Sequence, residues 1–165
     1  MRLSRVAAVL FALITVIVFS KVLVDASALL PQKVASHFGI SGQPDAWMAR
    51  GNVLILFAWV VALQSGSIPV LATVLSLALA GKSRRRIGVH IAFQSFWWFG
   101  LSMAFWTFML RLFVRANLGE PPVFDNAMAF LGAGIYIVGI IVVIVWTARS
   151  LPGNTQPVPP AAAAA

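Results

Sequence analysis

The sequence predicts an all-α fold, an integral membrane four-helix bundle with one structured extracytoplasmic loop. Hydrophobic residues make up 61% of the 165 residues and charged residues only 10%, whereas soluble domains contain about 45–50% and about 25%. Four apolar runs are each long enough to cross a hydrocarbon core of about 30 Å at about 1.5 Å per residue. A chain of this length is expected to form one domain, which we place at residues 1–150.

The four helices are expected at residues 6–24, 53–80, 91–110 and 127–146. The first run is preceded by Arg2 and Arg5 and followed by small residues, so cleavage of residues 1–28 as a secretory signal is an open alternative. In the second run Pro69 cannot donate a backbone hydrogen bond, which predicts a bend between Gln64 and Pro69.

Three connecting segments and a tail complete the predicted organisation. Residues 31–50 and 116–126 are loops rich in turn-forming residues, and residues 81–86 form a compact basic loop. Residues 151–165 are rich in Pro and Ala and carry no charge, which predicts a disordered tail.

Orientation follows from the distribution of Lys and Arg, because basic residues concentrate on the cytoplasmic side. One side carries seven of these residues, Arg2, Arg5, Lys82, Arg84, Arg85, Arg86 and Arg149. The other side carries five, Lys21, Lys33, Arg50, Arg111 and Arg115. We therefore expect a multi-pass protein of the bacterial inner (cell) membrane with both termini in the cytoplasm and residues 31–50 outside.

Composition excludes several classes of function. The chain has no cysteine, which excludes disulfides, thiolate catalysis and cysteine metal sites. The net charge is +8. Because the basic residues lie at the ends of the apolar runs, they indicate membrane topology and lipid contact rather than nucleic-acid binding. No hydrolase or nucleotide-binding motif is present. We expect no enzymatic activity, no cofactor and no metal.

The outward loop carries a pattern that resembles a known family. It contains, in order, Leu30, Pro31, His37, Phe38, Gly42, Pro44, Asp45 and Trp47. This pattern is similar to the bacterial membrane domain of unknown function found at the N-terminus of Sdp-type immunity proteins, whose loop after the first helix shows Leu-Pro, then His-Phe, then Gly-x-Pro-Asp-x-Trp. The resemblance covers about residues 15–60 and implies a multi-pass membrane fold with an immunity-like role.

The same loop is the best candidate for a binding site. We expect it to fold at the membrane surface, with Asp45 turned back towards His37 and with packing near residues 111–124. The candidate binding residues are His37, Phe38, Gly42, Pro44, Asp45 and Trp47. The alternative is a rigid connector in which His37 and Asp45 bond to turn backbone. A metal site is disfavoured because the ligand set is too small.

Four other constellations have mainly structural explanations. Residues 64–67 form a polar stretch within the second apolar run, which is expected either to hold helices together or to line a transport path. Lys21 and Asp25 are spaced to pair on one helix face. The aromatic third helix has only His90 nearby, which disfavours haem. Small residues of the fourth helix permit close helix packing, namely Ala129, Gly132, Ala133 and Gly139.

These observations predict a non-enzymatic binding or sensing protein. Its partners would be the lipid bilayer and an extracytoplasmic peptide or toxin, or a membrane protein, contacted through residues 31–50. The alternatives are an accessory structural subunit of a larger membrane complex and a small transporter.

Overall fold

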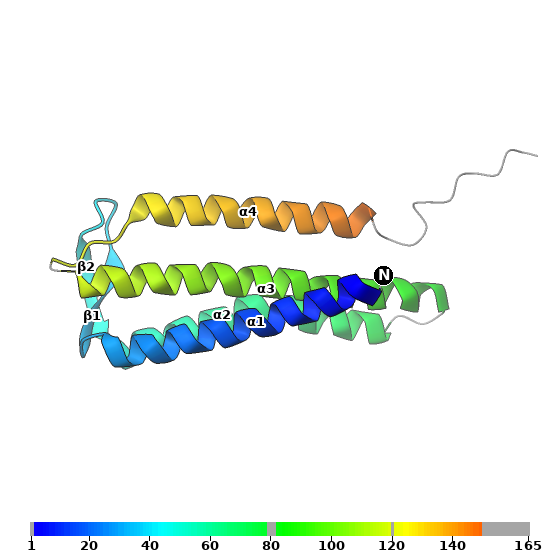
Figure 1. Ribbon diagram of the computed structural model, residues 1–165, viewed down its shortest axis with the longest axis horizontal. Helices are drawn as coiled ribbons and strands as arrows, with labels where there is room; N and C mark the ends of the chain where they lie inside the picture. Colours follow the sequence, from blue (N-terminus) through cyan, green and yellow to red (C-terminus); the bar gives the residue numbers. More distant parts are fainter. Residues whose placement is uncertain (1, 79–81, 120, 150–165) are drawn as a thin grey trace, which may run out of the picture.

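The computed structural model describes residues 2–78, 82–119 and 121–149. Its elements, in chain order, are α1 (Arg2–Leu29), β1 (Lys33–Phe38), β2 (Pro44–Ala49), α2 (Arg50–Ala78), α3 (Lys82–Leu118) and α4 (Asn126–Arg149). The helices run side by side, and the two strands form a hairpin that lies across one end of them (Figure 1). We call residues 33–49 the hairpin and this end of the bundle the hairpin end.

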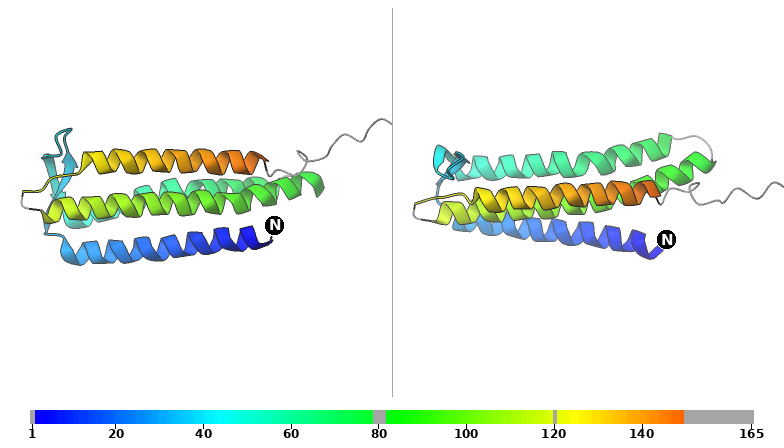
Figure 2. Two further views of the ribbon diagram at one scale, coloured as in Figure 1. Left: turned by 45° about the horizontal axis from the view of Figure 1, so that its top comes forward. Right: turned by 90° about the horizontal axis from the view of Figure 1, so that it is seen from above.

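Helix α3 is the centre of the bundle. Helices α1, α2 and α4 all contact it; in the right-hand view of Figure 2, α1 and α2 flank α3 on opposite sides and α4 overlaps it. All four helices contain segments long and apolar enough to cross a membrane, namely Ser4–Leu29, Arg50–Leu71, Gly88–Leu118 and Asn126–Arg149. Many large apolar side chains of α1, α2 and α4 are exposed, whereas most of those of the central α3 are partly or fully buried, which is the arrangement expected of a bundle whose outer helices face lipid.

A cluster of buried apolar residues joins α1, α2, α3 and the hairpin. It contains Phe19, Val22, Ala26, Leu30, Val34, Val53, Leu54, Val61, Met103, Leu110 and Phe113. Val34 belongs to β1 and is fully buried, so the hairpin is part of the core rather than an appendage. Where these helices lie in a membrane, such side chains associate through van der Waals packing rather than through removal from water.

Helix α4 docks on α3 through glycines. A Cβ atom on Gly132 would lie 2.3 Å from Phe108 Cε1, and one on Gly139 would lie 2.8 Å from Leu101 Cδ2. The predicted small-residue face therefore serves helix packing. Asp125 precedes α4 and its Oδ1 accepts a hydrogen bond from Met128 N–H at 2.9 Å, which is an N-cap arrangement.

The structure corrects the all-α prediction in one place. Residues 33–38 and 44–49 are β-strands, whereas the sequence predicted only a structured loop. Two short strands are marginal alone, and this pair is stabilised by contacts with residues distant in the chain, which a single sequence does not reveal.

The predicted helix ends were also too short. Helices α1, α3 and α4 extend beyond their predicted apolar runs at both ends, and α2 begins before its run and is described to Ala78, because an apolar run marks the lipid-facing part of a helix and not its ends. Residues 82–86, predicted as loop, begin α3, since Lys and Arg are good helix formers. Arg111 and Arg115, expected at the end of the third helix, lie inside α3, which continues to Leu118.

Two further predictions, the bend near Pro69 and the disordered tail, are not tested by these helix boundaries. Helix α2 is continuous from Arg50 to Ala78 with Pro69 inside it, and Ser67 Oγ donates to Gln64 O at 3.4 Å. The bend itself stays a prediction. The predicted tail, residues 151–165, lies outside the described residues.

Candidate functional site

The hairpin is an antiparallel pair with a defined register. Its paired residues are Lys33 with Ala49, Val34 with Met48, Ala35 with Trp47, His37 with Ala46 and Phe38 with Pro44. The register shifts on both sides of His37, so Ser36 and Asp45 lie outside the regular pairing. Irregularities of this kind re-aim side chains and increase local twist.

Gly42 forms the turn of the hairpin because its backbone has φ +78°, a region that disfavours side chains. Its N–H donates to Gly39 O at 2.8 Å, and Gly39 N–H donates to Gln43 O at 2.8 Å. A Cβ atom on Gly42 would lie 2.5 Å from Phe124 O. Glycine is therefore required here both for conformation and for close approach to another segment.

That segment is the connection between α3 and α4, which holds the hairpin tip. Phe124 N–H donates to Gly42 O at 2.9 Å, and the rings of Phe38 and Phe124 stack with centroids 5.3 Å apart. Asn126 Nδ2 donates to Gly39 O at 3.2 Å and to Ile40 O at 2.8 Å. The expected packing of the loop against residues near 111–124 is confirmed by these contacts.

The base of the hairpin is held by Asn117 of α3. Its Oδ1 accepts a hydrogen bond from Ala35 N–H at 2.6 Å, and its Nδ2 donates to Ala35 O at 3.2 Å. Both residues are buried. The amide of Asn117 thus pairs with β1 as a neighbouring strand would, and it satisfies one edge of the sheet.

Arg50, the first residue of α2, ties the strands to α1. Its backbone N–H donates to Gln32 O at 2.9 Å, and its Nη1 donates to Leu30 O at 2.6 Å. Leu30 follows the last residue of α1, where carbonyl groups lack helical partners. The position of the hairpin is therefore fixed by α1, α2, α3 and the α3–α4 connection.

The outer edge of β2 can be assigned from the register. Directly opposite residues in an antiparallel pair alternate between hydrogen-bonded pairs and pairs whose backbone groups point away from each other. The bond from Arg50 N–H to Gln32 O makes these residues a hydrogen-bonded pair. Two positions further on, Val34 and Met48 are again a hydrogen-bonded pair. Ala35 and Trp47, the next pair, must point their backbone groups outwards.

The contact between Ala35 and Asn117 agrees with this assignment, because it lies on the side of β1 away from β2. Trp47 therefore presents its N–H and C=O on the opposite, outer side of β2. Outside the sheet ladder, the described residues provide no hydrogen-bond partner for these two groups. One edge of the sheet is capped and the other is open.

His37 and Asp45 lie together on the hairpin, as the sequence predicted. His37 Nδ1 and Asp45 Oδ1 are 2.5 Å apart, with side chains 70% and 53% exposed. Because both groups are solvated, this pair contributes little to stability. Its exposure leaves the imidazole and the carboxylate accessible to a partner.

The other predicted site residues divide into two groups. Phe38 and Gly42 contact Phe124 and hold the hairpin in place, and Pro44 pairs with Phe38 in the ladder. The Trp47 side chain is 47% exposed. The residues that position the hairpin, Asn117, Phe124 and Asn126, were missed as site residues, since nothing in their local sequence links them to a segment about 80 positions away.

A separate polar network joins three helices in the bundle. Trp106 Nε1 donates to Gln64 Oε1 at 2.6 Å, and Gln64 Nε2 donates to Tyr136 OH at 3.3 Å. Tyr136 OH also lies 2.8 Å from Ser102 Oγ and its ring stacks on Phe105, with centroids 4.5 Å apart. Gln64 therefore connects α2 to α3 and α4.

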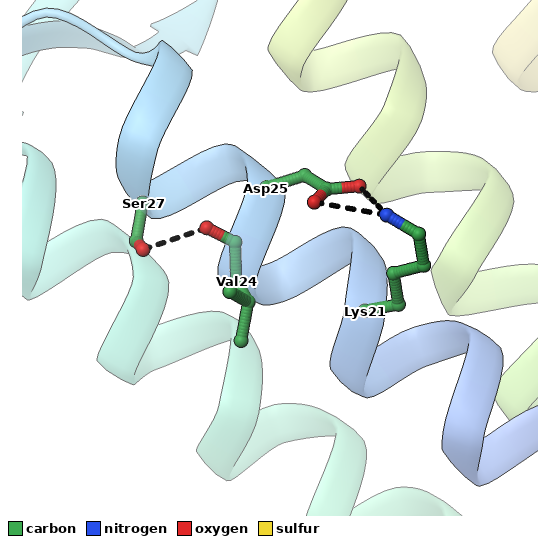
Figure 3. Close-up of polar contacts among 4 residues, drawn as sticks. All are labelled: Lys21, Val24, Asp25 and Ser27. Carbon is green, nitrogen blue, oxygen red and sulfur yellow. Dashed lines mark hydrogen bonds and ion pairs between the residues drawn. The ribbon is translucent and has the colours of Figure 1, made fainter.

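The other described titratable residues lie apart from the hairpin or pair locally. His90 is buried near Arg5 and Gln94, at the opposite end of α3 from the hairpin. Among residues 2–78, 82–119 and 121–149, no three His, Asp or Glu side chains gather in a way that could hold a metal ion. Lys21 Nζ contacts both carboxylate oxygens of Asp25, at 2.8 and 3.1 Å (Figure 3), which confirms the predicted pair.

Comparison with known protein families finds a similarity in the first part of the chain. Residues 6–63 match the family described as Domain of unknown function (DUF1648). The matched segment contains most of α1, the whole hairpin and the first half of α2. The predicted similarity to a domain of unknown function is thus confirmed over this segment, and it names no activity. No curated protein and no solved structure matches the chain.

Proposed function

We propose that this chain is a non-enzymatic multi-pass membrane protein that recognises an extracytoplasmic peptide or peptide toxin through the hairpin. Four apolar helices support membrane insertion. The similarity to a domain of unknown function includes the entire hairpin. The loop pattern of Sdp-type immunity proteins supports an immunity-like role, in which binding removes a secreted peptide from its target.

The observation that carries the proposal is the open edge of β2 on a firmly held hairpin. An extended peptide can pair with an exposed strand edge, and its backbone hydrogen bonds then supply affinity. Because the hairpin is already anchored at Asn117 and Phe124, little of the binding energy is lost in ordering it. Unprotected edges are normally avoided in soluble proteins, so an open edge here favours a partner.

Side chains around that edge supply specificity. The ring of Trp47 offers apolar area beside the open backbone groups. His37 and Asp45 offer an exposed hydrogen-bonding pair. We infer that Trp47, His37 and Asp45 contact the peptide, whereas Phe38, Gly42 and Pro44 maintain the shape of the hairpin.

The orientation of the protein in the membrane is part of the same proposal. The basic residues at 82–86 follow α2, at the other end of the bundle from the hairpin. Basic residues are retained on the cytoplasmic side, so the hairpin faces outwards and both termini face the cytoplasm of a bacterial cell.

The test uses selection of peptides from a random library on the purified full chain in mild detergent. Trp47→Pro removes a backbone N–H from the open edge and leaves the ladder intact, since Pro is tolerated on edge strands. Trp47→Ala is the control for loss of the ring. We expect Trp47→Ala to weaken binding of a selected peptide and Trp47→Pro to weaken it much further.

Met48→Pro is the control for disruption of the hairpin, because the Met48 N–H belongs to the ladder with Val34. Hydrogen exchange separates the two proline variants: the ladder amides should stay protected in Trp47→Pro and lose protection in Met48→Pro. Failure to select any peptide, or a selected peptide that binds Trp47→Pro as well as the wild type, would exclude strand pairing.

A second candidate function, an accessory subunit of a membrane complex, is favoured by α4. Only 6% of its apolar stretch is buried inside the protein, against 22%, 24% and 33% for the other three helices, so α4 has the most surface left for a membrane partner. A stoichiometric membrane partner that co-purifies in mild detergent and crosslinks to Val138 would favour this role. The role of Gln64 in joining helices supports a structural function for residues 64–67 over a transport path.

A further inference from the structure

A cleft of about 600 Å³ lies between α1 and α3 at the hairpin end of the bundle. Its lining is Val22, Asp25, Ala26, Leu29, Arg111, Val114, Arg115, Leu118 and Gly119. The charged side chains stand among apolar ones, so the cleft is amphipathic. Asn117, Phe124 and Arg50, whose hydrogen bonds hold the hairpin, do not line this cleft.

Among the described residues, the basic side chains of the cleft have no acidic partner. Asp25, the acidic residue among the described residues that line the cleft, is bound by Lys21 through both carboxylate oxygens (Figure 3). Arg111 and Arg115 are exposed and form no ion pair with any described residue. They are four positions apart on α3, where like charges repel each other. An anion between them would relieve this repulsion.

We propose that this cleft binds an anionic phospholipid, with the headgroup phosphate between Arg111 and Arg115. Guanidinium groups form paired hydrogen bonds with phosphate oxygens. The two arginines lie within two turns of the end of α3 at Leu118, which is the depth of a headgroup when the helix spans a bilayer.

The apolar lining distinguishes a lipid from a soluble phosphate. Leu29 is largely exposed and Leu118 about half exposed, and both border the cleft with Val114. These side chains offer a surface for an acyl chain, and a soluble anion would leave that surface in contact with water. The occupant is therefore an amphiphile with a phosphate headgroup.

The experiment titrates the delipidated full chain in mild detergent with phosphatidylglycerol or phosphatidylcholine of the same acyl chains, and counts bound lipid by native mass spectrometry. We expect a preference for phosphatidylglycerol. Arg111→Gln/Arg115→Gln should reduce its affinity by about tenfold or more, since charged hydrogen bonds are lost. Lys33→Gln/Arg149→Gln removes the same charge elsewhere and should keep the preference.

Two further variants keep the test decisive if the glutamine double variant folds poorly. Arg111→Lys/Arg115→Lys retains the charge without the planar guanidinium and should bind less tightly than the wild type. Asp25→Asn removes the negative charge of a residue that lines the cleft and should increase affinity. Equal binding of the two lipids, equal losses in both double glutamine variants, or full displacement of phosphatidylglycerol by millimolar inorganic phosphate would overturn the proposal.

Discussion

The side-chain amide of Asn117 forms hydrogen bonds with both backbone groups of Ala35, accepting from its N–H at 2.6 Å and donating to its C=O at 3.2 Å. The two residues are 82 positions apart in the chain. A third bond, from Asn117 Nδ2 to Phe113 O at 3.1 Å, fixes the amide on α3. One side chain therefore sets the position of β1 relative to the bundle.

Asn117→Ala should release the base of the hairpin. It leaves two buried backbone groups of Ala35 without partners, at a cost of about 1–3 kcal/mol each. Hydrogen exchange of residues 31–50, followed by mass spectrometry, should become markedly faster. Asn52→Ala is the matched control, because Asn52 is exposed at the start of α2. If both variants exchange as slowly as the wild type, Asn117 does not anchor the hairpin.

Gly42→Ala should release the tip. An alanine at φ +78° is strained by about 1–2 kcal/mol, and its Cβ would lie 2.5 Å from Phe124 O. Gly51→Ala is the control, since nothing lies within 4 Å of a Cβ at that position. Thermal unfolding in detergent should show a lower midpoint for Gly42→Ala alone. Equal midpoints would mean that the tip is not held by Phe124.

Gly132→Ala should separate α4 from α3, because the added Cβ would lie 2.3 Å from Phe108 Cε1. Gly134→Ala lies on the same helix with nothing within 4 Å and should be neutral or stabilising by up to about 1 kcal/mol, the difference in helix propensity. Denaturant titration in mixed micelles measures both. A Gly132→Ala variant as stable as Gly134→Ala would contradict the observed docking.

Tyr136→Phe should weaken the polar network while keeping the ring on Phe105. The hydroxyl that contacts Ser102 and Gln64 is lost, and interhelical hydrogen bonds in membranes contribute about 0.6 kcal/mol on average, at most about 1.7 kcal/mol. Ser27→Ala is the control, because Ser27 Oγ bonds only to Val24 O of its own helix (Figure 3). Equal unfolding free energies for the two variants would exclude a stabilising network.

Sequence patterns predicted the four helices because lipid-facing helices are apolar on all sides, and that signal does not depend on tertiary contacts. The ion pair between Lys21 and Asp25 could be predicted for a similar reason, because both residues lie on one helix and their contact needs no tertiary structure. The pairing of His37 with Asp45 followed from turn residues between them. These features are all local in the chain.

The strands could not be predicted in the same way. Residues 33–38 and 44–49 show little alternation of apolar and polar side chains, and their stability comes from Asn117, Phe124 and the buried core. Only the fold brings these together. The open edge of β2 likewise depends on register, which a single residue shift would reverse.

Hydrogen exchange at the backbone amide of Trp47 tests the central claim most directly. In the purified full chain, the amides of Val34 and Met48 should exchange slowly because they belong to the ladder, whereas the Trp47 amide should exchange rapidly. Addition of a saturating selected peptide should then protect the Trp47 amide. A Trp47 amide already protected in the free protein, or one that still exchanges rapidly with peptide bound, would contradict recognition through the edge of β2.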